Sequence, residues 1–140
     1  MRFMVIVPAT RESEAGVLPD AKILDAMSKF NEELSQAGVL LGMEGLHPSR
    51  RGARLKFDAG TVTVTDGPFT ETKELVAGFW LIEAKSRDEA IAWMKQAPMG
   101  GGFQLELREV AEVADFGGAA TPEVRARDGR TRSAMAARRK

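Results

Sequence analysis

The chain contains no cysteine, only one histidine and no long hydrophobic run. The absence of cysteine excludes disulfides, thiolate catalysis and cysteine-ligated metals, and it is compatible with a reducing compartment. The single imidazole, His47, has no second histidine to share a metal with, so we expect neither a metal nor a cofactor. The apolar stretch at residues 3–7 is too short for a signal peptide or a membrane span, and we expect a soluble, cytoplasmic protein.

The net charge of zero conceals an uneven distribution along the chain. Residues 122–140 hold seven Lys and Arg against two Asp and Glu, so the rest of the chain is acidic. From residue 117 onward large apolar side chains are scarce, and such a segment buries too little surface to offset its ordering entropy. We therefore predict a folded domain at residues 1–116 and a basic, disordered C-terminal extension at residues 117–140. The extension is consistent with phosphate binding, with an acidic protein partner or with simple solvation.

Hydrophobic periodicity and turn residues predict six strands and two helices in the order β-α-β-β-β-β-α-β. Residues 9–19 are interpreted as a polar connection. Asp20 opens the first helix, and Ser86 with Glu89 forms a capping box that opens the second. The predicted strands occupy residues 2–8, 39–44, 53–57, 61–65, 78–84 and 104–110.

This element order indicates an α+β fold, a ferredoxin-like (split βαβ) sandwich with an inserted β-hairpin. Two helices cover only one face of such a sheet. The strands carry more apolar side chains than one face can hold, including Phe3, Val5, Phe79 and Leu81. We therefore expect a homodimer packed sheet to sheet.

The segment DGPFTETKE, residues 66–74, follows a predicted strand and has two interpretations. In the first it is a turn: Asp66 accepts hydrogen bonds from downstream backbone N–H groups, Gly67 takes an unusual backbone angle and Phe69 fills the edge of the core. In the second, Asp66 is an acid/base or ligand-orienting carboxylate, assisted by Glu71 and Lys73. The two interpretations are compatible, because a carboxylate held by backbone donors is well oriented.

His47 and Arg54 are further candidates. If His47 faces Asp66, the carboxylate fixes its tautomer and gives a general base that works near neutral pH; a solvated loop histidine is the alternative. Arg54 can bind a carboxylate or phosphate, or can simply protect a hairpin edge. Specific nucleic-acid binding is not expected, because the acidic body lacks clustered cations beside Phe79 and Trp80.

Several segments together carry a resemblance to a known family. They are residues 2–7, the helix exit at 33–40, Leu46-His47-Pro48, residues 66–74 and residues 78–83. On these segments, within residues 1–113, the chain resembles the YCII-related family, and specifically its DGPF-domain branch.

The resemblance implies a dimeric α/β-barrel of ferredoxin-like subunits. It also implies a small-molecule site near the dimer interface, with a catalytic histidine and aspartate. The family's aspartate corresponds to Asp66, whereas the only imidazole, His47, lies before Pro48 and not near the first strand. The predicted site therefore has Asp66 and His47 as catalytic candidates and Glu71, Lys73 and Arg54 as ligand-binding candidates. The alternative that the resemblance implies is a non-enzymatic regulatory module associated with an extracytoplasmic-function sigma factor or another protein.

Overall fold

The computed structural model describes residues 1–139. The chain divides into two compact units, Met1–Glu109 and a second unit that begins at Val110. No helix within residues 1–139 is long and apolar enough to cross a membrane.

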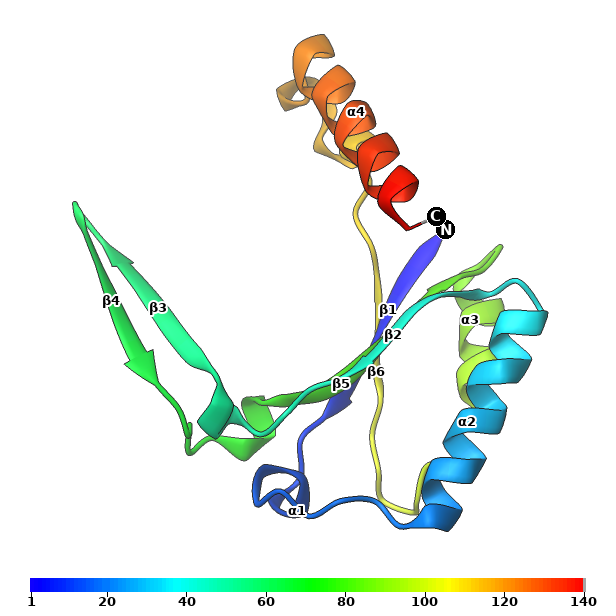
Figure 1. Cartoon of the computed structure of the whole chain (residues 1–140). Coiled ribbons are helices and arrows are strands. Elements are labelled where there is room, and N and C mark those ends of the chain that lie inside the picture. The colour runs from blue at the N-terminus through cyan, green and yellow to red at the C-terminus, as the bar shows by residue number, and fades with distance from the viewer. Residues whose placement is uncertain (140) are drawn as a thin grey trace. The chain divides into compact units, whose positions relative to one another are not determined.

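A four-stranded antiparallel sheet forms the first unit (Figure 1). Its spatial order is β2-β5-β1-β6, so the first strand is central, which agrees with its almost continuous apolar sequence. The strands are β2 (Leu40–Gly45), β5 (Val76–Glu83), β1 (Arg2–Pro8) and β6 (Glu106–Glu109).

Two helices, α2 (Ala21–Gln36) and α3 (Arg87–Met94), lie on the same side of this sheet (Figure 1). The Asp20 side chain caps α2 by accepting from the Ile23 N–H at 2.9 Å. Ser86 caps α3 by accepting from the Glu89 N–H at 3.1 Å, while the Glu89 carboxylate accepts from the N–H of Lys85. The prediction of two capped helices after the first and fifth strands is confirmed.

One helix was missed. Residues 9–19 contain the short helix α1 (Arg11–Glu14) where a polar connection was expected. Thr10 and Ser13 form a reciprocal capping box, with the Ser13 N–H donating to Thr10 Oγ1 at 3.1 Å and the Thr10 N–H to Ser13 Oγ at 2.8 Å. A single turn has too few apolar positions to show a helical period, so the cap was its only sequence signal.

The core lies between the helices and one face of the sheet. Strand alternation places the side chains of Phe3, Val5, Trp80 and Ile82 on this face, where they are buried. They pack with side chains of the helices and of the strand ends, namely Phe30, Leu34, Val39, Ala84 and Ala90. The mixed α+β class is therefore confirmed.

No helix of the first unit lies over the opposite face of the sheet. The same alternation places Met4, Ile6, Phe79 and Leu81 on this outer face, and all four are only half-buried. The four apolar residues that suggested a second covering layer are thus divided, with Phe3 and Val5 facing the helices.

The inserted hairpin is present as a separate two-stranded sheet. It consists of β3 (Ala53–Asp58) and β4 (Thr61–Asp66), joined by a turn in which Gly60 has φ 81°. The pairing is regular, from Ala53 opposite Asp66 to Asp58 opposite Thr61. Every residue of both strands is exposed.

The second unit contains the 3₁₀ segment η3 (Val113–Ala119) and the helix α4 (Pro122–Arg138), although its composition predicted disorder. Thr121 caps α4 by accepting from the Val124 N–H at 3.2 Å. Arg125 donates to the Ala120 carbonyl at 2.8 Å, which joins the helix to η3. Alanine and arginine favour a helix even where little surface is buried. The prediction of disorder rested only on the scarcity of large apolar side chains. The domain boundary at residue 116 stays a prediction, and residue 140 lies outside the described residues.

Candidate functional site

The DGPF segment links the hairpin to the central sheet. Asp66 is the last residue of β4, the Gly67–Pro68 peptide is cis, and η2 (Thr72–Glu74) leads into β5. The Asp66 side chain is exposed and makes no hydrogen bond or ion pair with residues 1–139. The prediction that downstream backbone N–H groups hold Asp66 is therefore wrong, and the Phe69 N–H donates to Ser49 instead.

Ser49 holds this segment in place. The Phe69 N–H donates to Ser49 Oγ at 2.9 Å, and Ser49 donates from its own N–H and Oγ–H to the two Glu14 carboxylate oxygens at 3.0 and 2.6 Å. The Gly67 N–H donates to the Gly52 carbonyl at 3.0 Å. Helix α1, the turn after β2 and the DGPF segment are thereby joined through one hydroxyl group.

Gly67 is required by the closeness of these backbones. A Cβ atom built on Gly67 would lie 1.8 Å from the Ser49 carbonyl oxygen and 2.6 Å from its carbon. No rotamer relieves this overlap, since the obstacle is backbone. The second motif position is therefore explained by packing alone.

We expect Ser49→Ala to lower the free energy of unfolding by about 1–3 kcal/mol, because the Phe69 N–H and the Glu14 carboxylate both lose their partner. Urea denaturation measures this loss, and amide hydrogen exchange at Phe69 should become faster. Ser35→Ala on exposed helix surface is the control and should stay within about 0.5 kcal/mol of wild type. Unchanged exchange at Phe69 in Ser49→Ala would contradict this role of Ser49.

The five residues predicted for the site do not form one cluster of bonded side chains. Asp66, His47, Glu71, Lys73 and Arg54 are all exposed, and no hydrogen bond or ion pair between them occurs within residues 1–139.

Each of these residues has a different local setting. The Arg54 guanidinium lies over the Phe69 ring, with Cζ 3.9 Å from the ring centroid, as a cation–π contact. Lys73 borders a hollow shared with Ile6, Pro8 and Glu106. His47 lies between β2 and the 3₁₀ turn η1 (Ser49–Arg51), and Glu71 precedes η2 without capping it.

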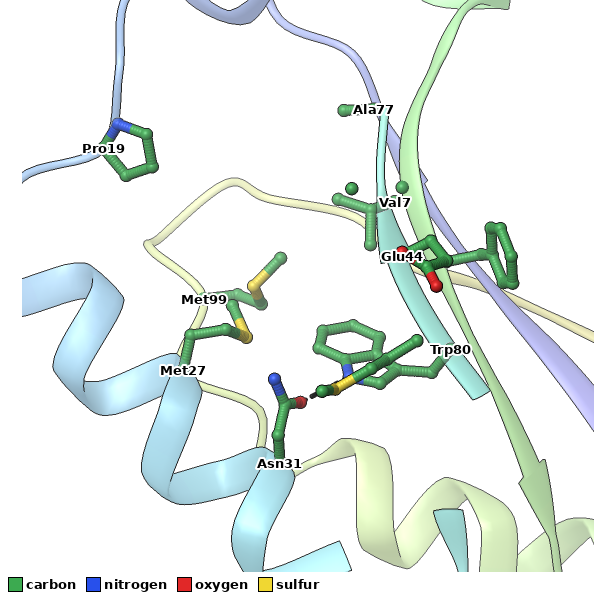
Figure 2. A pocket seen from close by; sticks show the side chains of 12 residues that line it. Val7, Pro19, Met27, Asn31, Glu44, Ala77, Trp80 and Met99 are labelled. Atoms are coloured by element: carbon green, nitrogen blue, oxygen red, sulfur yellow. Dashed lines mark hydrogen bonds between the residues drawn. The ribbon is translucent and has the colours of Figure 1, made fainter. Parts of the chain in front are cut away.

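A cavity of about 500 Å³ lies elsewhere in the first unit, between α2, the sheet and the segment after α3 (Figure 2). Its wall is mainly apolar, with three methionines and the Trp80 ring. The lining residues are Val7, Pro19, Met27, Asn31, Met43, Glu44, Gly45, Ala77, Gly78, Phe79, Trp80 and Met99.

The polar side chain of Asn31 borders this cavity. Asn31 Oδ1 accepts from Trp80 Nε1–H at 2.7 Å, which fixes the amide and the indole against each other (Figure 2). The Asn31 NH₂ group has no acceptor among residues 1–139. Glu44 lies opposite Phe79 in the β2–β5 pair, so its carboxylate is on the outer face of the sheet. The cavity thus combines an apolar wall with one donor group, the Asn31 NH₂.

Sequence reasoning missed this cavity, because its residues come from five segments unrelated by spacing. Trp80 and Phe79 were considered as a nucleic-acid surface, which the acidic body argued against, and not as part of a ligand cavity. One local signal existed: Asn31 lies on the buried stripe of α2, one residue after Phe30 and three before Leu34. A polar side chain on an apolar helix stripe needs a partner, and here the partner is the Trp80 indole.

The antiparallel sheet, the helices on one of its faces and the inserted hairpin define a small α+β domain. The chain belongs to the YCII-related family, whose domain model matches residues 1–116. An uncharacterized protein of Rhizobium meliloti is 39% identical over 90 residues, which cover 61% of this chain and 73% of the relative.

A solved structure is also similar to this chain. It is a 5-chloro-2-hydroxyhydroquinone dehydrochlorinase from Burkholderia phenoliruptrix, in complex with 2,5-dihydroxybenzoquinone. The sequence identity is 15%, the TM-score is 0.41, and the match covers 80% of this chain and 95% of the other.

Proposed function

We propose that this protein binds a small, neutral hydroxyaromatic molecule in the cavity beside Trp80. The observation that carries the proposal is the cavity itself, whose volume of about 500 Å³ is within the range of small-molecule sites. An aromatic ring packs against Trp80 and the methionines, and an oxygen of the ligand accepts from the Asn31 NH₂. The lining residues include no Lys, Arg or His to pair with an anion, so a neutral ligand is favoured.

A panel of phenols, hydroquinones and matched benzoates tests this proposal by thermal denaturation and by titration. A ligand at 100 times its dissociation constant adds about 2.7 kcal/mol to the free energy of unfolding. Asn31→Leu should weaken binding of the best neutral compound at least about tenfold, because the oxygen of the compound loses the Asn31 NH₂ donor.

Gln36→Leu, at the exposed end of the same helix, is the matched control and should bind like wild type. Wild-type affinity in Asn31→Leu, or an absence of binding by any neutral member of the panel, would refute the cavity as the site.

Catalysis by Asp66 is the second candidate. It is favoured by an exposed carboxylate with no partner in residues 1–139, at the end of a loop that Ser49 and Glu14 hold. Asp66 does not line the cavity, so we expect Asp66→Asn to keep ligand binding there and to lose, by at least about 100-fold, turnover of a substrate bound at the base of the hairpin. Turnover by Asp66→Asn at the wild-type rate would show that neither Asp66 nor an Asp66–His47 pair takes part in catalysis.

We also propose that the subunit is ferredoxin-like and that two subunits pair through the outer faces of their sheets. The order β2-β5-β1-β6, with helices after β1 and β5, supports the first part. The second part is supported by the half-buried outer face that carries Met4, Ile6, Phe79 and Leu81.

A further inference from the structure

The β3–β4 hairpin carries an apolar face that no other part of its unit covers. The register places Leu55 opposite Val64 and Phe57 opposite Val62, so the four side chains share one face of the two-stranded sheet. Their exposed fractions are 56% for Leu55, 60% for Val64, 75% for Phe57 and 52% for Val62. We call these four side chains the arm face.

The opposite face of the hairpin is polar. It holds Arg54, Lys56, Asp58 and the threonines at 61, 63 and 65. The hairpin thus has the alternation of a sheet with one buried face, yet both of its faces are exposed in the single chain.

An isolated two-stranded hairpin is at best marginally stable in water. In Figure 1 this hairpin projects away from the four-stranded sheet as an arm. Its base is fixed, because the Gly67 N–H donates to the Gly52 carbonyl and Ser49 anchors Phe69. A fixed base with an uncovered apolar face indicates a surface that packs on another molecule.

We propose that the arm face packs on a second copy of this chain, so that each subunit of a dimer holds the other with its hairpin. This inference rests on the proposed dimer and is independent of the ligand cavity. The hairpin leaves the sheet after β2 and returns at β5, the strand that bears Phe79 and Leu81 of the uncovered outer face. The hairpin that bears the arm face is therefore connected directly to β5, a strand of the proposed interface. In the proposed dimer the arm face packs on the partner subunit beside that interface and enlarges it.

The apolar area also fits a second copy. Four side chains exposed to this degree present on the order of 400 Å² of apolar surface, near the upper size of patches that monomers leave uncovered. A twofold dimer makes every contact twice. Two arms and the surfaces that they cover therefore bury about 1,600 Å², the area of a standard stable interface.

Sedimentation equilibrium of the full chain over a range of concentrations tests the proposal. We expect a wild-type dimer whose dissociation constant rises at least about 100-fold in the double variant Leu55→Thr, Phe57→Thr, since threonine keeps the strand propensity and removes the apolar contact. Lys56→Thr changes the polar face of the same strand and should leave the dissociation constant within about threefold of wild type.

A photoreactive phenylalanine at position 57 provides a second measurement that does not depend on variant stability. Mixing isotopically light and heavy chains before irradiation should give crosslinked peptides that join one light and one heavy chain. Crosslinks confined to a single chain would overturn the inference. A dimer that survives the double variant refutes the arm but leaves the sheet interface and the cavity standing, whereas a monomeric wild type refutes both arm and dimer and leaves ligand binding untouched.

Discussion

Gly67→Ala should lower the free energy of unfolding by about 3 kcal/mol or more, because the added Cβ atom overlaps the Ser49 carbonyl oxygen. Relief requires movement of one of two backbones that are joined by the hydrogen bonds of Ser49 and Gly52. Urea denaturation followed by circular dichroism measures the change. The loss should be accompanied by faster amide exchange at Phe69.

Gly100→Ala is the matched control for this prediction. No atom lies within 4 Å of a Cβ built on Gly100, so its effect should stay within about 0.5 kcal/mol of wild type. A similarly small effect of Gly67→Ala would show that the DGPF segment is loosely packed and that glycine there has another purpose.

Trp80→Ala should cost about 3–5 kcal/mol, the usual range for removing a buried aromatic side chain. Trp80 is 4% exposed, and its ring meets the Phe30 ring edge to face at a centroid distance of 5.8 Å. Its loss also leaves Asn31 Oδ1 without the indole N–H donor. The substitution therefore removes contacts between α2 and β5 and also removes part of the cavity wall.

Trp80→Phe distinguishes these contributions. It keeps an aromatic ring against Phe30 and loses the hydrogen bond to Asn31, so its cost should be clearly smaller than that of Trp80→Ala. Both variants are measured by urea denaturation. Equal costs for the two variants would mean that the hydrogen bond, and not the ring packing, holds the helix on the sheet.

Local patterns were sufficient to predict most of the first unit. The apolar run of β1, the stripe of α2, the Asp20 and Ser86 caps and the turn at Gly60 each act within a few residues, and each occurs where it was predicted. Short-range rules describe such features well. Helix α1 and helix α4 were missed because one is a single turn and the other buries little apolar surface.

The contacts that define the DGPF segment could not be predicted from spacing. Glu14, Ser49 and Phe69 are separated by 35 and 20 residues and meet only because the β2 exit, α1 and the hairpin base converge. The motif indicated residues 66–74 as a candidate site. In the structure Gly67 allows close packing against Ser49, and the Phe69 N–H donates to the Ser49 hydroxyl. The role of Asp66 stays a prediction.

The cavity illustrates the same limit in a different way. Its methionines and its Asn31–Trp80 pair come from segments that are brought together by tertiary packing. Each residue alone suggests core packing. Only their convergence around an open volume suggests a ligand.

Methyl NMR of the methionines tests the central claim most directly, because three of the seven methionines line the cavity. With methyl-labelled methionine, titration of the best neutral hydroxyaromatic compound should shift Met27, Met43 and Met99. The resonances of Met1, Met4 and Met135 should stay unchanged. Shifts at Met4 with none at Met27 and Met99, or saturable binding that moves no methionine of the cavity, would contradict the account.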